Sequence, residues 1–77
     1  MGFTLRTVVH EGTGKTGVVI ERYRLRAHTL GEAKREVDRG NWVRGWIEPN
    51  GFEIVDDSEA VLAQRSYQGK NVYAPWT

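Results

Sequence analysis

The chain has 77 residues and no cysteine, and its 11 Lys and Arg nearly balance 10 Asp and Glu, for a formal net charge of +1. A chain this short has little room for a buried catalytic cleft, and without cysteine it has neither disulfides nor thiolate metal sites. Its longest aliphatic run, Val18-Val19-Ile20, is far too short to span a membrane; we therefore expect a single cytoplasmic domain over residues 1–77.

The first part of the chain predicts a β-hairpin. Residues 3–9 alternate apolar and polar side chains, which is typical of a strand, and the glycine-rich stretch 10–17 predicts a loop. Residues 18–27 predict the second strand. Because strand side chains alternate between two faces, we expect Val19 and Tyr23 on one face. The opposite face would carry three arginines, Arg22, Arg24 and Arg26.

The loop contains a weak nucleotide-binding signal. Residues 12–16 read Gly-Thr-Gly-Lys-Thr and end like a phosphate-binding P-loop, but the motif requires a glycine where Val9 stands. A P-loop also opens a helix, whereas the sequence from Val18 onward is typical of a strand. We therefore interpret this stretch as a hairpin loop and expect no nucleotide cofactor.

A helix is predicted directly after the second strand. Thr29 followed by Glu32 is a capping box, in which the threonine hydroxyl accepts a hydrogen bond from the first turn and the glutamate reaches back to the threonine amide. The helix is expected to run over residues 30–39 and to end at Gly40 in a left-handed cap. Its narrow apolar stripe consists of Leu30, Ala33 and Val37.

The second part of the chain predicts three more strands. Residues 41–48 are expected to form one of them, and the turn signal Glu-Pro-Asn-Gly at 48–51 leads into a returning strand at 52–55. Residues 60–67 could form another. Residues 68–77 are expected to be an extended aromatic tail, which either packs on its own core or docks onto a neighbouring molecule.

The predicted element order is β-β-α-β-β-β, which is an α+β fold. One helix would pack on one face of a four- or five-stranded, mostly antiparallel sheet. The order is similar to that of β-grasp proteins, but this likeness of element order implies no activity.

Catalytic and metal-binding groupings are not evident. His10 and His28 fall at the ends of different elements, and neither has a cysteine or a suitably spaced carboxylate nearby in the sequence. The acidic residues at 56–59 lack the ordered spacing of a calcium loop. We therefore expect that the protein is not an enzyme and that it binds no metal.

The segment 41–48 supplies the aromatic part of a candidate binding face. In a strand, Trp42, Arg44 and Trp46 would share one side, and we assign that side outward, although one or both tryptophans could instead fill the core above Ala33. Together with the arginines of the second strand, the expected partner-binding face consists of Arg22, Arg24, Arg26, Trp42, Arg44 and Trp46.

Such a face indicates a small interaction or regulatory protein, and the small size and arginine bias suggest a bacterial or phage accessory protein. Arginine and tryptophan dominate protein-binding hot spots, so a protein partner or a second copy of the chain is the expected ligand. The alternative is a nucleic-acid-binding module with arginines on phosphates and indoles on bases. Against it stand a pI of only about 8.1 and the acidic segment 48–59.

Overall fold

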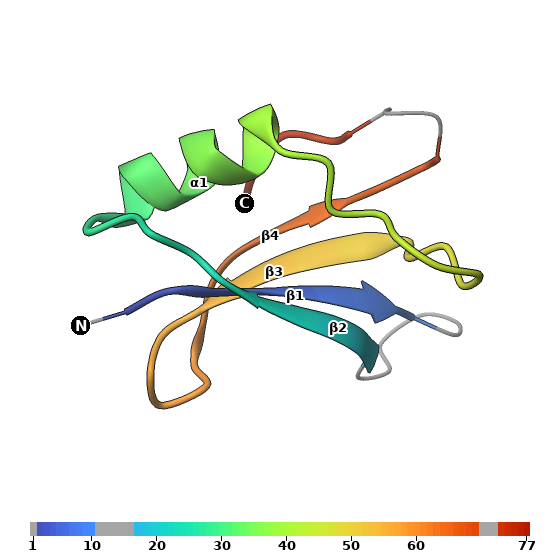
Figure 1. Cartoon of the computed structure of the whole chain (residues 1–77), viewed down its shortest axis with the longest axis horizontal. Coiled ribbons are helices and arrows are strands. Elements are labelled where there is room, and N and C mark those ends of the chain that lie inside the picture. Colours follow the sequence, from blue (N-terminus) through green and yellow to red (C-terminus); the bar gives the residue numbers. More distant parts are fainter. Residues whose placement is uncertain (1, 11–16, 70–72) are drawn as a thin grey trace.

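The computed structural model describes residues 2–10, 17–69 and 73–77 of the chain. Four strands form one antiparallel sheet in the spatial order β2-β1-β3-β4, and α1 covers one of its faces (Figure 1). The α+β class is therefore confirmed, with the order β-β-α-β-β, whereas the likeness to the β-grasp fold is not confirmed. The elements are β1 (Thr4–Val9), β2 (Val18–Arg24), α1 (Leu30–Arg39), β3 (Gly51–Val55) and β4 (Val61–Ser66).

The hydrophobic core lies between α1 and the sheet. The central strands β1 and β3 supply its largest side chains, and Leu5, Phe52 and Ile54 are completely buried. Burial of each such side chain contributes roughly 1.5–3 kcal/mol. The buried cluster consists of Phe3, Leu5, Leu25, Ala33, Val37, Phe52, Ile54, Ala63 and Tyr67.

The β1–β2 hairpin contains an irregularity that changes which side chains share a face. Thr7 lies opposite Glu21, but the next residue, Val8, lies opposite Val19. One residue of β2 is thus left over, as in a β-bulge, and alternation is interrupted there. Val19 therefore stands with Val8 on the face away from α1, and the expectation that it shares the face of Tyr23 is wrong.

The two caps of α1 agree with the prediction in part. The Thr29 hydroxyl accepts a hydrogen bond from the Glu32 amide at 3.2 Å and donates to the Glu32 carboxylate at 3.2 Å, so the capping box closes through the hydroxyl. The predicted left-handed cap at Gly40 is wrong, because its backbone is extended (φ −92°, ψ 166°). Glycine is required for another reason: a Cβ atom there would lie 2.6 Å from the indole of Trp42.

The predicted strand at 41–48 does not form. Gly45 has a positive φ of 89°, which bends the chain and ends the alternation on which the prediction rested. The Trp42 indole also donates to the Val37 carbonyl at 2.9 Å, which holds the start of this segment against α1. The segment joins the sheet at Asn50, whose amide donates to the Val8 carbonyl at 3.0 Å.

The C-terminal segment packs on its own chain. The amide of Ala74 donates to the Ser66 carbonyl at 3.0 Å, and Thr77 and Gln64 exchange two backbone hydrogen bonds of 2.9 and 3.1 Å. Residues 73–77 therefore cover the outer edge of β4. The sequence left open whether this tail packs in cis or docks onto a neighbour, and the structure answers with cis packing.

Arg65 holds this tail in place. Its guanidinium lies 4.4 Å from the ring centre of Trp76 and 5.0 Å from that of Tyr73, an arrangement that favours cation–π attraction. The same guanidinium pairs with Asp38 of α1 and donates to the Ala74 carbonyl at 2.8 Å. Burial raises the pKa of Tyr73, with a further contribution from Tyr67.

No helix in residues 2–10, 17–69 and 73–77 is long and apolar enough to cross a membrane.

Candidate functional site

Three arginines on the sheet face away from α1 are neutralised by acidic side chains of the same chain. The pairs join β1 and β2 to β3 and to the β3–β4 turn, and we call Arg6, Arg22 and Arg24 the acid-paired arginines. The contacts are Arg6–Glu53 at 2.6 Å, Arg6–Glu59 at 3.3 Å, Arg22–Glu59 at 2.6 Å and Arg24–Asp57 at 3.0 Å.

The Arg6–Glu53 pair is the least accessible of these contacts. The two residues are directly opposite each other on β1 and β3, and their side chains are only 16% and 12% exposed. Arg6 also lies opposite Arg22 on β2, an arrangement of like charges that is destabilising by itself. Glu59 contacts both guanidinium groups and so relieves this repulsion.

The β3–β4 turn positions these acids. One carboxylate oxygen of Asp56 accepts from the Ser58 amide at 2.8 Å, the Ser58 hydroxyl at 2.7 Å and the Ala60 amide at 3.0 Å. This closed turn places Glu59 in the left-handed region, with φ of 68°, and directs its side chain over the sheet. The hydrogen bonds from Ser58 and Ala60 lower the pKa of Asp56.

The other two turn carboxylates also favour their charged form. The Gly2 amide donates to Asp57 at 2.9 Å, and this bond, together with Arg24, lowers the pKa of Asp57. The hydrogen bond from Arg22 lowers the pKa of Glu59. At neutral pH the carboxylates of the turn are therefore negatively charged and neutralise the acid-paired arginines.

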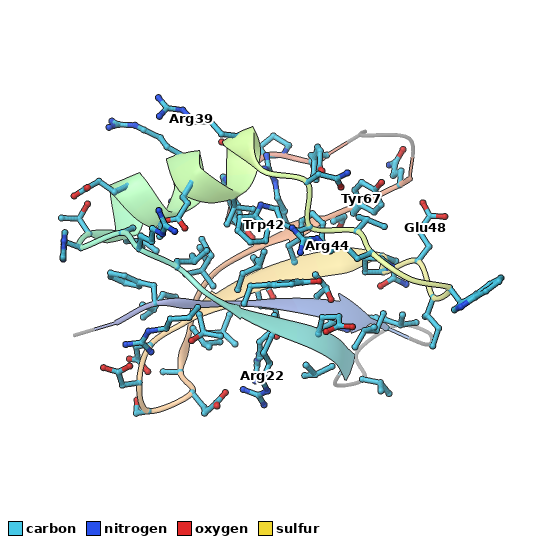
Figure 2. The ribbon with its side chains drawn as sticks, in the orientation of Figure 1. Arg22, Arg39, Trp42, Arg44, Glu48 and Tyr67 are labelled. Carbon is cyan, nitrogen blue, oxygen red and sulfur yellow. The ribbon has the colours of Figure 1, made fainter. Side chains whose placement is uncertain are left out.

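The other predicted site residues lie elsewhere. Trp42 is half-buried on the α1 side of the sheet, with its ring centre 5.2 Å from that of Tyr23, and the guanidinium of Arg44 lies 5.5 Å from the same tyrosine ring. Figure 2 shows Trp42 and Arg44 on one side of the sheet and Arg22 on the other. Trp46 is fully exposed. The expectation that all six residues share one face is wrong, because the segment carrying the tryptophans is not a strand.

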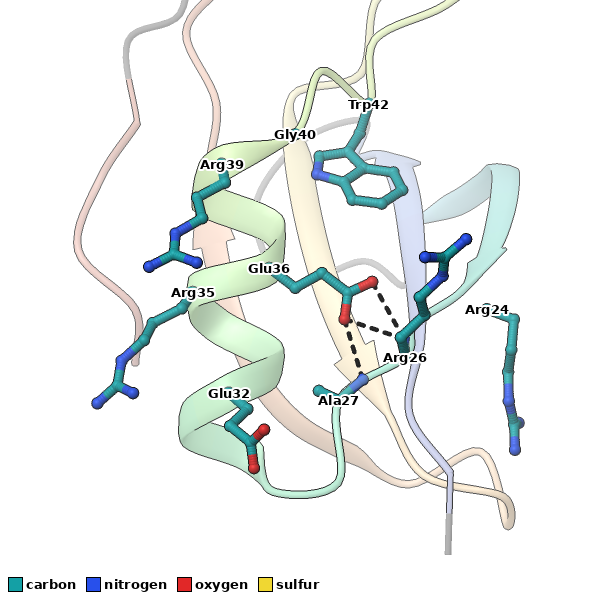
Figure 3. A pocket seen from close by; sticks show the side chains of 9 residues that line it. All are labelled: Arg24, Arg26, Ala27, Glu32, Arg35, Glu36, Arg39, Gly40 and Trp42. Atoms are coloured by element: carbon teal, nitrogen blue, oxygen red, sulfur yellow. Dashed lines mark hydrogen bonds between the residues drawn. The ribbon is translucent and has the colours of Figure 1, made fainter.

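A groove between α1 and the end of β2 has a different set of arginines in its lining (Figure 3). Its volume is about 760 Å³. Figure 3 shows Arg24 and Arg26 pointing apart, so that Arg26 leaves the face of the acid-paired arginines. The lining consists of Arg24, Arg26, Ala27, Glu32, Arg35, Glu36, Arg39, Gly40 and Trp42.

The two acids of the groove are engaged in backbone structure. The Glu36 carboxylate accepts from the Arg26 amide at 2.9 and 3.1 Å and from the Ala27 amide at 3.0 Å, while Glu32 takes part in the cap of α1. In the described part of the chain, no ion pair engages the remaining cations of the lining. We call these the groove arginines: Arg26, Arg35 and Arg39.

The sequence interpretation missed Arg35 and Arg39, although a signal for them was present. They are four residues apart on α1 and therefore lie on one side of it, the side opposite the apolar stripe that packs on the sheet, and Figure 3 shows both side chains pointing away from Arg26. That they line the same groove as Arg26 depends on how the helix packs, which no local pattern specifies.

The chemistry available to this groove is recognition of anions. Guanidinium groups bind carboxylate or phosphate oxygens, often through two parallel hydrogen bonds. Within the described ranges, no group of three or more His, Cys, Asp and Glu residues could hold a metal ion. The P-loop-like stretch 12–16 lies outside the described residues, and the chain continues from it into β2 rather than into a helix.

No protein-family model, curated protein or solved structure matches this chain.

Proposed function

We propose that this chain is a non-enzymatic interaction domain that binds a protein partner through the groove arginines. One observation carries the proposal: Arg26, Arg35 and Arg39 line an open groove beside the half-buried indole of Trp42, and no ion pair neutralises them in the described part of the chain. Arginine and tryptophan side chains contribute most of the energy in many protein interfaces.

The charge around the groove favours a protein over a nucleic acid. Glu32 and Glu36 belong to the lining and would repel the continuous phosphate backbone of DNA or RNA, whereas single carboxylates of a protein can be placed between them. The net charge of +1 is also modest for a nucleic-acid-binding domain. The likeness to β-grasp proteins in element order carries no activity and adds no support.

Trp46 is a second exposed feature, outside the groove lining. Its side chain is fully exposed, and that of the adjacent Ile47 is 60% exposed. Both follow Arg44 in the segment that leaves α1, so an aromatic anchor and a guanidinium lie on the same irregular stretch. An exposed tryptophan beside an exposed isoleucine fits an interface that excludes water on binding.

The proposal is tested by affinity capture from a nuclease-treated extract with matched charge variants. The double variant Arg35→Glu/Arg39→Glu reverses the groove, whereas Arg22→Gln removes an arginine on the opposite face. We expect a protein that the parent chain and Arg22→Gln capture and that the groove variant does not. Equal capture by all three chains would contradict the proposal.

Nucleic acid is the second candidate, and the exposed indole of Trp46 next to Arg44 is the observation that favours it. An exposed indole can stack on any base. If this candidate were correct, a labelled single-stranded oligonucleotide would bind at low salt, and its affinity would fall by roughly 0.7 powers of salt concentration for each phosphate contact. Absence of oligonucleotide binding at low salt would eliminate it.

A further inference from the structure

The C-terminal segment, residues 73–77, lies along the outer edge of β4 like a bound peptide. Tyr73 pairs with Tyr67 in an antiparallel bridge, and the segment makes three backbone hydrogen bonds with Ser66 and Gln64. Pro75 has no amide hydrogen to add to them. The structure thus shows directly what this edge accepts: a short extended stretch with an aromatic residue on each side of a proline.

The acceptor for this segment is built by the rest of the chain. Arg65 of β4 pairs with Asp38 of α1, and neither residue belongs to the segment. The Arg65 guanidinium lies 5.0 Å from the ring centre of Tyr73 and 4.4 Å from that of Trp76, and the Trp76 indole donates to the Asp38 carboxylate at 3.3 Å. Because the ion pair and the edge of β4 need no residue of the segment, the acceptor is also present in a chain whose own segment has left.

A second copy of the chain carries the ligand that this acceptor fits. Exchange of residues 73–77 between two copies breaks and remakes the same hydrogen bonds and ring contacts, so these contacts favour neither arrangement. The arrangement within one chain is favoured by tethering, because residues 68–72 alone join Tyr67 to Tyr73. A short link of this kind corresponds to an effective concentration on the order of millimolar.

We propose that residues 73–77 of one copy dock on the β4 edge and the Arg65–Asp38 pair of a second copy, which gives a reciprocally exchanged dimer at chain concentrations of about 1 mM. Two copies that each give and receive a segment close into a two-fold dimer, so both β4 edges stay covered. The inference goes beyond the proposed function, because the groove arginines take no part in the exchange.

Single cysteines in this cysteine-free chain report the exchange. Gln64 and Thr77 exchange two backbone hydrogen bonds, so their α carbons lie about 5.5 Å apart, within the range of a disulfide. Chains carrying Gln64→Cys and Thr77→Cys are mixed at about 1 mM in a glutathione buffer, and the mixed disulfide is measured by intact mass. In the control for random collision, His28→Cys replaces Gln64→Cys, because His28 is exposed and precedes α1.

We expect about ten times more mixed disulfide with Gln64→Cys than with His28→Cys. Trp76→Ala gives a directional check. In the chain with Thr77→Cys it weakens the docking segment and should lower the yield severalfold. In the chain with Gln64→Cys it vacates the acceptor and should raise the yield severalfold. Equal yields for Gln64→Cys and His28→Cys, or a yield that is the same whichever chain carries Trp76→Ala, overturn the inference.

A deletion gives an independent readout. Removal of residues 69–72 leaves only Gln68 between Tyr67 and Tyr73, and the shortest common hairpin loop has two residues. The segment then cannot pair with its own β4 edge, but it can still reach that of a second copy. We expect the variant to be a dimer by sedimentation velocity at about 50 µM, where the parent chain is a monomer. A folded monomer overturns the inference; if circular dichroism shows that the variant is unfolded, the cysteine pairs decide.

Discussion

The two groups of arginines in this molecule are alike in chemistry and differ in what surrounds them. The acid-paired arginines, Arg6, Arg22 and Arg24, contact carboxylates of β3 and of the β3–β4 turn. The groove arginines lie beside acids that are bound to the backbone. A regular row of arginines along a strand can therefore stabilise the fold through ion pairs. The arginines that remain without ion pairs in the described part of the chain come instead from less regular positions, at the end of β2 and on α1.

This difference has a direct consequence for substitutions. A charge pair that is largely removed from water is costly to break on one side only, because the remaining charge has lost its solvent and its partner. An exposed arginine contributes little to stability. We therefore expect that substitutions among the acid-paired arginines and their carboxylates lower the free energy of unfolding. Substitutions of the groove arginines are expected to weaken binding instead.

The largest effect is expected for Glu53→Ala. The variant leaves the Arg6 guanidinium, 16% exposed and with its Nε atom already lacking a partner, without its nearest carboxylate. We expect a loss of about 3 kcal/mol in the free energy of unfolding, measured by urea denaturation.

The double variant Arg6→Met/Glu53→Leu is the control for this prediction. Replacement of both charges by apolar side chains removes the unpaired group, so stability should return to within about 1 kcal/mol of the parent. A loss of less than about 1 kcal/mol in Glu53→Ala would show that the pair is not structural.

The next largest effect on the free energy of unfolding is expected at Glu36, whose carboxylate accepts backbone hydrogen bonds beside the groove. Glu36→Ala leaves the amides of Arg26 and Ala27 without their acceptor, which should cost about 1–2 kcal/mol in urea denaturation. Glu36→Gln retains one acceptor oxygen and should lose about half as much. Equal losses in both variants would indicate that the charge rather than the hydrogen bond matters.

The turn acids predict a smaller effect that depends on pH. The pKa of Glu59 is lowered in the folded state by Arg22, so its contribution to stability is present above its unfolded pKa and is lost as pH falls through the folded pKa. Stability should therefore decline as pH falls below about 4, and less steeply in Glu59→Gln. An NMR titration should show that Arg22→Gln raises the pKa of Glu59; no change would refute this pairing in solution.

The smallest effect on stability is expected for the groove arginines. Arg39→Gln and Arg35→Gln should each change the free energy of unfolding by less than about 0.5 kcal/mol, because neither guanidinium has an acidic partner in the described part of the chain. The same substitutions should weaken capture of the protein partner from a nuclease-treated extract. A large loss of stability in either variant would mean that these residues are structural after all.

Local patterns in the sequence predicted the hairpin and α1 because the information for both is local. Alternation in β1 and the pairing of Thr29 with Glu32 each involve neighbours a few residues apart. The same reasoning failed at 41–48, where the positive φ of Gly45 and the bond from Trp42 to Val37 depend on packing.

The candidate site was less predictable than the fold. The sequence indicated that an acidic stretch would border the sheet, but the pairing of Arg22 with Glu59 joins residues 37 positions apart. That pairing depends on the closed turn around Asp56, which neither residue specifies. The groove likewise depends on the packing of α1 against the end of β2, so composition could suggest an arginine-rich surface without locating it.

The covered edge of β4 has a consequence for stoichiometry. A sheet with two unpaired edges can pair with a neighbouring molecule on each side, so molecules of this kind can add to one another in a continuous row. Here the chain's own last residues already pair with β4, so another strand can add at that edge only by displacing them. Removal of those residues would leave the amides and carbonyls of β4 unpaired along its outer edge.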